Sequence, residues 1–441
     1  MNITNHFEPE VNPMLAVDLK EQLTANLPFE EIVSALVTHF KELWWSCEPT
    51  LLDLGPVYSP NEKKACEAKL VNCLDQLGEE LKRISRDRHD RRALQDRLFP
   101  LAGYILKITF GIEDRHVAAL TSYGFAESVE EFVCRARQFD PDISAADIYQ
   151  AGRNAWSMNL MQYLMGMPVE VTPAVLAYSL LYPYSDNYLD DPGIPAKVKA
   201  TFSHDFERRL EGMPVQAANT TEQKIFELVG MIEGQFDRQL YPEVYASLMA
   251  IFRAQTKSMR LQLPNASPYE VDVLGLDIEK GGTAVLADGY LVAGSLTPFQ
   301  REFSFYYGAF TQLMDDLEDV EQDRKDGIMT VFSQTACHWP LDAVTSRAIV
   351  FGNGLLDAMS HFHVTGLDTL EEIMRKCITP LMIDSASQVG HRYSRGYMVE
   401  LERHSPYRFS QLKQLRRKLA RRFATEELVE TIILANGKMT Q

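Results

Sequence analysis

The sequence has few of the features that mark disulfide-rich, fibrous or membrane-spanning proteins. Its 441 residues include only 24 glycines and 6 cysteines. The cysteines are scattered without Cys-x-x-Cys spacing, so we expect neither a disulfide framework nor a zinc site. No stretch approaches the roughly 18 apolar residues of a transmembrane helix. The first residues lack a basic start followed by an apolar run, so we expect no signal peptide and a cytoplasmic location.

Positive charge is scarce as well. Lys and Arg number 44 against 61 Asp and Glu, and the resulting net charge of −17 argues against a general nucleic-acid-binding protein. The exception is the segment from Arg403 to Phe423, which has many Lys and Arg residues, no Asp or Glu, and leucines such as Leu412 and Leu415 on one helical face. We interpret it as an amphipathic surface helix packed on the acidic remainder. A peripheral membrane contact and a cap over a site are the alternatives.

Helical periodicity is present along most of the chain. Hydrophobic residues make up 46% of the sequence and recur at helical spacing, for example between Pro28 and Trp45. No segment alternates with the period of two that a half-buried strand requires. We find no internal repeat of about 20–50 residues either. The sequence therefore predicts an all-α protein, with about a dozen or more helices at ordinary helix lengths.

The stretch from Gly308 to Gly327 carries most of the chemical information. Read as a helix, it gathers several carboxylates on one face, and such a face repels itself unless a cation is present. Oxygen ligands without Cys or His favour Mg²⁺, or Mn²⁺ in its place, and Mg²⁺ shares its shell with waters and substrate phosphates. The face consists of Gln312, Asp315, Asp319 and Asp323, with Asp316 at its margin.

A second acidic site lies about 130 residues earlier in the chain. Asp186 and Asp190 are four residues apart in the last turn of a helix that opens at Thr172 and is stopped by Asp191-Pro-Gly-Ile-Pro195. Carboxylates at a helix C-terminus oppose the helix dipole unless a cation compensates them. Alone, this site could be a solvated helix end. Together, two acidic helix faces can oppose each other across a bundle and hold metal ions between them.

These two motifs resemble those of the class I isoprenoid synthase superfamily. The pattern Gly308-x-Phe310-x-Gln312-x-x-Asp315-Asp316-x-x-Asp319 is similar to the second aspartate-rich motif of trans-prenyltransferases. The stretch from Asp186 to Asp191 resembles the first motif, in a spacing nearer to that of squalene and phytoene synthases. The resemblance covers roughly residues 100–430. It implies a helical bundle in which paired carboxylates and Mg²⁺ clamp the diphosphate of a prenyl substrate.

Three further residues fit the resemblance. Lys280, which precedes Gly281 and Gly282, stands where prenyltransferases and large terpene synthases carry a diphosphate-contacting Lys. We expect the two glycines to interrupt their helix, as a ligand contact or as a simple kink. Arg392 and Tyr393, on a late helix expected over residues 368–399, resemble the Arg-Tyr pair with which class I terpene synthases hold diphosphate.

The departures from the family pattern bear on the reaction. Chain-elongating prenyltransferases carry an Arg-Arg-Gly soon after the first motif, and here Asp191 to Lys199 contain no such pair. A binding site for isopentenyl diphosphate is therefore not indicated. The Asn-Ser-Glu metal triad of many terpene cyclases is also absent, replaced by the aspartate-rich helix. The pattern favours a cyclase or coupling enzyme on a prenyltransferase-like scaffold.

Aromatic and polar residues near the motifs suggest a cavity between the helices. Tyr182 lies one turn below Asp186, and Phe305 lies about two turns from Gln312 on the same face. Aromatic faces can stabilise a carbocation, although a core position explains such residues as well. Three polar side chains on the preceding helix could reach the same cavity or serve helix packing; they are Arg153, Asn154 and Asn159.

The sequence thus predicts a class I terpene synthase, a carbon–oxygen lyase that ionises a linear prenyl diphosphate and cyclises the carbocation. The alternatives are a prenyltransferase (elongating or head-to-head coupling) and a non-catalytic helical subunit that binds divalent ions. We expect a helical N-terminal extension over residues 1–100 and the catalytic domain over residues 101–441. A homodimer is among the assemblies that the sequence allows. The expected roles are metal binding for Asp186, Asp190, Asp315, Asp316 and Asp319, diphosphate binding for Lys280, Arg392 and Tyr393, and cavity lining for Tyr182, Phe305 and Gln312.

Overall fold

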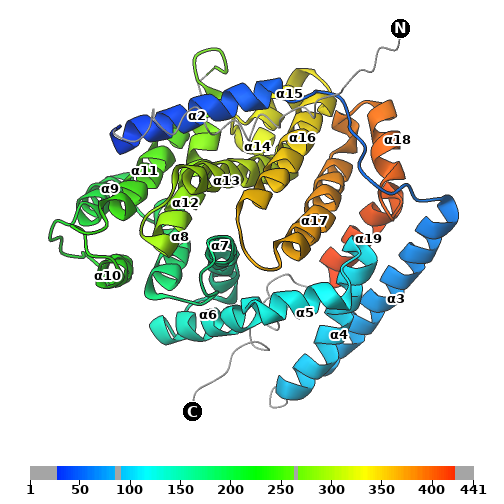
Figure 1. The fold of residues 1–441 in the computed structure, drawn as a ribbon, viewed down its shortest axis with the longest axis horizontal. Coiled ribbons are helices and arrows are strands. Elements are labelled where there is room, and N and C mark those ends of the chain that lie inside the picture. Colours follow the sequence, from blue (N-terminus) through cyan, green and yellow to red (C-terminus); the bar gives the residue numbers. More distant parts are fainter. Residues whose placement is uncertain (1–26, 85–90, 263–266, 423–441) are drawn as a thin grey trace, which may run out of the picture.

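The computed structural model describes residues 27–84, 91–262 and 267–422 (Figure 1). Within these ranges the chain forms eighteen α-helices, three short 3₁₀ helices and no strand, which confirms the all-α prediction. No helix in the described part is long and apolar enough to cross a membrane. The α-helices are α2 (Phe29–Ser46), α3 (Pro60–Ile84), α4 (Arg91–Phe110), α5 (Asp114–Ser122), α6 (Phe125–Phe139), α7 (Ala145–Leu164), α8 (Pro173–Asp190), α9 (Ala196–Leu210), α10 (Thr220–Gln235), α11 (Pro242–Ser258), α12 (Val273–Ala293), α13 (Pro298–Glu318), α14 (Val320–Asp326), α15 (Val331–His338), α16 (Asp342–Ala358), α17 (Leu367–Gln388), α18 (Arg395–Arg403) and α19 (Phe409–Arg422).

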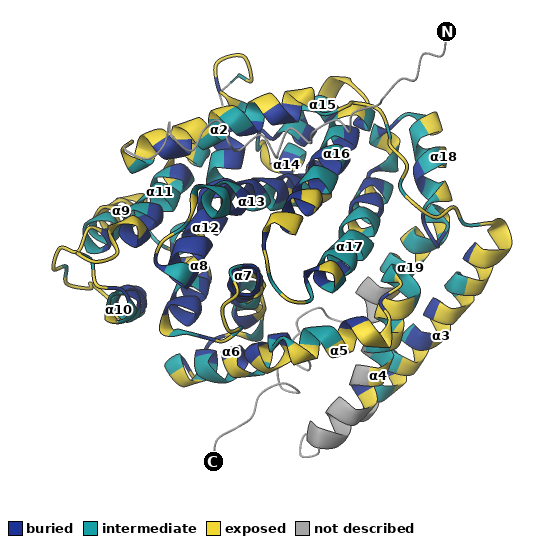
Figure 2. Cartoon of the chain, in the orientation of Figure 1, coloured by how far each residue is buried: buried dark blue, intermediate teal, exposed yellow. Residues whose placement is uncertain are grey.

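Helices α12 and α13 form the centre of the fold, with α7, α8, α11 and α16 packed around them (Figures 1 and 2). Their starts are set by local sequence. The Asp272 side chain accepts a hydrogen bond from the Gly275 N–H and begins α12. Thr297 caps α13, with Pro298 in the first helical position. Each fully buried Leu or Phe on these helices contributes about 1.5–3 kcal/mol of hydrophobic stabilisation, so the pair anchors the core.

Glycine allows α12 and α13 to approach closely. A Cβ atom added to Gly308 would lie 2.2 Å from the Gly281 carbonyl oxygen, and one on Gly282 would lie 2.5 Å from the Phe305 ring. The expected interruption at Gly281 and Gly282 is wrong: α12 is continuous through both residues. The roughly 1 kcal/mol that each glycine costs in a helix interior is offset by the packing of α13 against the bare backbone.

Helix α2 belongs to the main bundle. Helix α2 packs on α11, α12, α13 and α16, with Phe40 and Trp44 fully buried in the main core. His39 Nδ1 lies 2.8 Å from Glu302 Oε1 on α13. Helix α2 therefore shares one core with the helices after residue 101. By contrast, α3 and α4 lie together at one side of the molecule (Figure 1).

The basic helix α19 packs on α3 and α17. The Arg408 guanidinium, just before α19, binds the Glu67 carboxylate on α3, with a 2.9 Å contact from Nε to Oε1. Arg416 forms an ion pair with Asp384 on α17. Leu412 and Leu415 line a small cavity of about 40 Å³ between α3 and α19. These contacts are those of an amphipathic helix packed on acidic partners. Leu419 and Phe423, further along the same basic segment, lie outside the described side chains.

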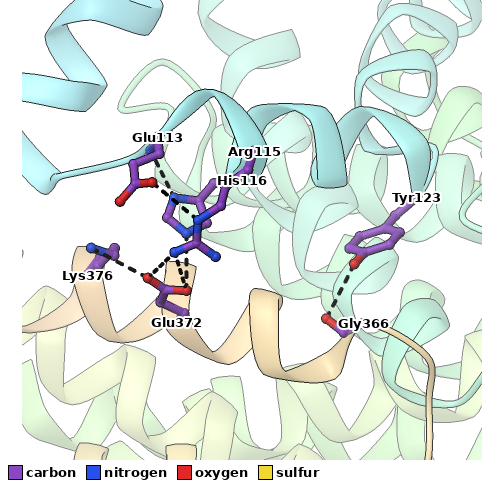
Figure 3. A network of polar contacts seen from close by, with 7 residues as sticks. All are labelled: Glu113, Arg115, His116, Tyr123, Gly366, Glu372 and Lys376. Atoms are coloured by element: carbon purple, nitrogen blue, oxygen red, sulfur yellow. Dashed lines mark hydrogen bonds and ion pairs between the residues drawn. The ribbon is translucent and has the colours of Figure 1, made fainter.

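A polar network joins α5 to α17 (Figure 3). Arg115 Nη2 on α5 lies 2.7 Å from Oε1 and 2.8 Å from Oε2 of Glu372 on α17. His116 is fully buried beside them, with its Nε2 atom 3.2 Å from Glu372 Oε2. One helical turn further along α17, Lys376 lies 3.7 Å from Glu372. Both contacts come from one guanidinium nitrogen and the two side chains are partly exposed, so the network links α5 to α17 but contributes little to stability.

Candidate functional site

The aspartate-rich segment is divided between two helices. Helix α13 ends at Glu318, and Asp319 is at once its C-cap and the residue that precedes α14. The Asp315 side chain is 52% exposed, whereas Asp316 is only 3% exposed and points into the interface with α12. The expected single acidic face is therefore wrong in one respect. Asp315 and Asp319 lie at the surface, while Asp316 and Asp323 are buried.

The first acidic site lies at the end of α8, as predicted. Thr172 caps this helix by accepting a hydrogen bond from the Val175 N–H at 3.2 Å. At its other end, Asp186 Oδ1 accepts a 3.5 Å contact from Gln255 Nε2 on α11, and Asp190 is the last helical residue and exposed. Burial raises the pKa of Asp186 to about 6, with a smaller opposing effect from Lys280. A carboxyl group placed in this way is easier to ionise once a cation binds beside it.

Lys280 on α12 lies between the two acidic motifs. Burial raises the pKa of both Asp186 on α8 and Asp315 on α13, and the positive charge of Lys280 lowers both. Its ammonium group forms no direct ion pair with any carboxylate among the described residues. The structure thus brings two aspartates, separated by about 130 residues in sequence, around one lysine.

Arg153 on α7 provides a second cation at this place. Its Nη2 atom lies 3.3 Å from Asp315 Oδ1. Tyr182, which is 44% exposed, is hydrogen-bonded to Asp186 and lies near enough to Asp315 for both carboxylates to raise its pKa, after the larger effect of burial. Four helices, α7, α8, α12 and α13, therefore meet at one cluster. The sequence marked Arg153 only as a polar residue that could reach a cavity.

Behind Asp315, two buried carboxyl groups face each other across the α12–α13 interface. Asp277 and Asp316 are each 3% exposed. Gln312 Nε2 donates to Asp316 Oδ1 at 3.0 Å. Burial raises the pKa of both groups, and a hydrogen bond between the two carboxyl groups lowers the pKa of Asp277 and raises that of Asp316. Burial and the Asp316 charge also raise the pKa of Asp323 to about 7.

Deeper in the bundle, partly exposed side chains line the inward faces of the same helices. Tyr178 on α8 donates a 3.2 Å hydrogen bond to the Ala284 carbonyl on α12, and Tyr307 lies two turns from Asp315 on α13. Tyr178, Ala284 and Tyr307 each retain some exposed surface. Phe305, expected here, is 0% exposed and packs on Gly282 instead. The expectation that Phe305 lines a cavity is therefore not met.

A buried acid that sequence reasoning missed lies below these residues. Asp288 on α12 is fully buried, and it accepts hydrogen bonds from Asn154 Nδ2 at 3.2 Å and Ser157 Oγ at 2.9 Å. Burial raises the pKa of Asp288 to about 8. The sequence analysis identified Asn154 as a possible cavity residue but did not identify Asp288 as its partner, because Asp288 lies on another helix, within an apolar stretch of sequence. Asn159, flagged beside it, is used in packing: it accepts from Ser128 Oγ at 2.7 Å.

The raised pKa of Asp288 predicts a loss of stability with rising pH. The unfolded chain loses this proton near pH 4 and the folded chain near pH 8, so the contribution is complete below about pH 4 and is lost as the pH rises towards 8. Between pH 6 and 8 we expect a loss of about 2–3 kcal/mol from this group. Denaturant unfolding at both pH values should show a smaller loss in Asp288→Asn. The control Asp368→Asn, at an exposed position in α17, should behave as wild type; equal pH slopes in both variants would contradict the assignment.

Arg392 and Tyr393 have other partners. The late helix expected over residues 368–399 is broken: α17 ends at Gln388, and a 3₁₀ turn over Gly390–Arg392 precedes α18. Arg392 Nε donates to Glu321 Oε1 on α14 at 2.7 Å. The Tyr393 side chain is buried, with its hydroxyl 2.8 Å from Thr345 Oγ1 on α16. Neither contact is with the carboxylates around Lys280, so a diphosphate contact would require both side chains to change partners.

An open cavity of about 600 Å³ lies on the other face of α8. It is lined by Tyr184 and Asn187 of α8 and by the loop that holds Gly193. Asp186 and Asp190 are not among the residues that line it, and neither are Lys280, Arg153 or Asp315. The cavity therefore does not belong to the Lys280 cluster.

The residues of the cluster fit a divalent cation. Burial raises the pKa values of Asp186 and Asp315, and Lys280 offsets this only in part, so a bound divalent cation would favour the ionised carboxylates. In the described ranges, no group of three or more His, Cys, Asp or Glu side chains is arranged to hold a metal ion by itself. This arrangement suits Mg²⁺, because Mg²⁺ is typically bound by one or two carboxylates, with waters and substrate phosphates as its other ligands.

Comparison with known proteins adds no family. No family model matches the chain, and no curated protein is significantly similar to it.

Proposed function

We propose that the protein is a class I terpene synthase, which ionises a linear prenyl diphosphate with Mg²⁺ and cyclises the resulting carbocation. The observation that carries this proposal is the position of Lys280, whose charge acts on Asp186 from one acidic motif and on Asp315 from the other. The carboxylates on either side of Lys280 can bind divalent cations, and the lysine can contact an anion that is bound to the same cations. A diphosphate is such a ligand.

The chain supplies a distinct group for each part of this ligand. Asp186 and Asp190 on one side, and Asp315, Asp316 and Asp319 on the other, would hold Mg²⁺, with Mn²⁺ as a substitute. When bound, the ion stabilises the negative charge of the departing diphosphate. Lys280 and Arg153 would contact the diphosphate oxygens directly. For Arg392 and Tyr393 the same role follows only from family resemblance, since their present partners are Glu321 and Thr345.

The inward-facing residues suit the hydrocarbon part of the substrate. Tyr182 on α8 is 44% exposed beside Asp186, and Tyr178 on α8 and Tyr307 on α13 are half-buried near Asp288. Their ring faces are negative, so they can stabilise a cation while the surrounding helices exclude water. Because no second diphosphate-binding motif is present, intramolecular cyclisation is the favoured fate of the cation.

Two alternatives are separable from this proposal by product analysis. A prenyltransferase is favoured by the similarity of the α13 motif to trans-prenyltransferases. A non-catalytic ion-binding subunit is favoured by the lack of a ready three-carboxylate site among the residues that the structure describes. The test is incubation of the full-length protein and Mg²⁺ with farnesyl, geranylgeranyl or geranylfarnesyl diphosphate, with and without isopentenyl diphosphate. We expect a cyclic product from a single diphosphate. Product only with isopentenyl diphosphate would indicate elongation, a head-to-head dimer would indicate coupling, and no product would favour the binding subunit.

A further inference from the structure

The cavity of about 600 Å³ beside α8 has no part in the proposed function. Its walls come from five segments: the α6–α7 loop, the start of α7, the last turns of α8, the α8–α9 loop with the start of α9, and the start of α10. Small-molecule sites in proteins have volumes of about 300–1,000 Å³. The cavity therefore has the space that an organic ligand needs.

Hydrogen bonds between these segments form the cavity in the absence of a ligand. Asn187 Nδ2 on α8 donates to Asp147 Oδ1 on α7 at 2.8 Å. Asn219, which caps α10, donates through Nδ2 to the Tyr188 hydroxyl on α8 at 2.9 Å. Asp191 Oδ1 accepts a 2.7 Å hydrogen bond from the backbone N–H group two residues later, which fixes the turn after α8. The walls are thus already in place, as they are in most ligand sites.

The walls of the cavity are negatively charged. The lining residues include no Lys, Arg or His and four aspartates, which are Asp140, Asp142, Asp147 and Asp191. Asp140 is 5% exposed and has its own counter-charge, because Lys224 Nζ lies 2.6 Å from its Oδ2 atom. Among the described residues, no Lys, Arg or His forms an ion pair with the other three. A cation is therefore the complementary ligand.

One wall already shows how an ammonium group is held here. Lys224 Nζ contacts the Asp140 carboxylate and lies 5.8 Å from the centroid of the Tyr184 ring, a combination that stabilises an amine cation. Ile143 and Ile194 add apolar surface to the lining. In the described part of the chain, no three acidic side chains are arranged as a metal site. Carboxylates separated by apolar surface suit an organic cation better than a single metal ion.

We propose that this cavity binds a linear polyamine. Its ammonium groups would pair with the carboxylates of Asp142, Asp147 and Asp191, and its methylene groups would lie against the apolar walls. Because Asn187 and Asp191 are cavity residues, the ligand would lie against the end of α8 that carries the first acidic motif. The inference goes beyond the proposed function and does not depend on it.

The test is calorimetric titration of the full-length protein with spermidine at physiological ionic strength and with Mg²⁺ in excess. Salt screens weak surface attraction, and Mg²⁺ competes for the carboxylates around Lys280. We expect saturable binding of one spermidine per chain. The double variant Asp142→Asn with Asp191→Asn keeps the size of both side chains and should bind about tenfold more weakly, because two partly exposed ion pairs are lost.

The charge-matched control is the double variant Asp326→Asn with Asp368→Asn, which removes two exposed carboxylates from α14 and α17. It should bind spermidine within about twofold of wild type, because distant surface charges are screened. Equal affinities in the two double variants, or no saturable binding by wild type, would overturn the proposal.

A third variant tests the same cavity if the first double variant does not fold. Val198 lines the cavity and is 41% exposed, so Val198→Lys places an ammonium group at its rim without removing a carboxylate. The new charge should compete with the ligand and weaken spermidine binding about tenfold. Binding to folded Val198→Lys as tight as to wild type would contradict the proposal.

Discussion

Replacement of Asp315 by asparagine is expected to reduce turnover of a prenyl diphosphate by about 10³-fold, since metal stabilisation of a leaving group contributes several kcal/mol. The side chain is half exposed, and its one direct partner is Arg153 at 3.3 Å. The change should therefore leave the free energy of unfolding within about 0.5 kcal/mol of wild type, as for most surface positions. Loss of activity without loss of stability is the signature of a residue that acts on the reaction.

The matched control is Asp326→Asn, an exposed carboxylate in the same acidic stretch. Its charge acts on Asp323, and its Oδ2 atom accepts a 2.6 Å hydrogen bond from Gln322 Nε2. We expect turnover within a few-fold of wild type, because the effect of an exposed surface charge on other groups is screened by salt. If Asp315→Asn retained full turnover, or if both variants lost it equally, the metal role of Asp315 would be wrong.

Gly308→Ala is expected to destabilise the fold by about 3 kcal/mol or more, at the upper end of overpacking effects. The added Cβ atom would lie 2.2 Å from the Gly281 carbonyl oxygen and 2.9 Å from the Val285 Cβ atom. Neither atom is the end of a flexible side chain, so α13 must move away from α12. That movement would separate Asp316 from Asp277 and Asp315 from Lys280. Denaturant unfolding measures the first effect, and the Mg²⁺ dependence of turnover measures the second.

Gly152→Ala provides the comparison within the same bundle. Gly152 lies inside α7, and a Cβ atom there would meet no atom within 4 Å. The higher helix propensity of alanine should stabilise this variant by about 0.5–1 kcal/mol. Opposite signs for the two glycine substitutions are therefore expected. A Gly308→Ala variant as stable as wild type would contradict the close α12–α13 packing that positions the site.

Local sequence was sufficient to predict the all-α class and the positions of the two acidic motifs, because both depend on spacing within one segment. The Thr172 cap and the end of α8 at Asp190 are where the sequence places them. The break at Asp319 was not predicted, since a run of polar residues carries no signal for where a helix is divided. The continuity of α12 through Gly281 was missed for a different reason: glycine tolerance depends on the helix packed against it.

The interior of the site could not be read from the sequence. Asp277 and Asp288 lie in an apolar stretch, and each has its polar partner on another helix. Asp277 is hydrogen-bonded to Asp316 on α13, and Asp288 accepts a hydrogen bond from Asn154 on α7. Arg392 shows the converse. Its sequence context resembles a diphosphate-binding pair, but the structure gives it Glu321 as a partner because α17 ends before it. Spacing along one chain predicts faces of helices and does not predict which faces meet.

The central claim is that the carboxylates around Lys280 serve to ionise a prenyl diphosphate. The measurement that tests it most directly is release of inorganic diphosphate from farnesyl, geranylgeranyl or geranylfarnesyl diphosphate by the full-length protein, without isopentenyl diphosphate, as Mg²⁺ is titrated. The account predicts multiple turnovers per chain with at least one substrate, dependent on Mg²⁺ and abolished by its chelation. Folded, Mg²⁺-supplied protein that releases no diphosphate above the protein-free rate from any of the three would contradict it.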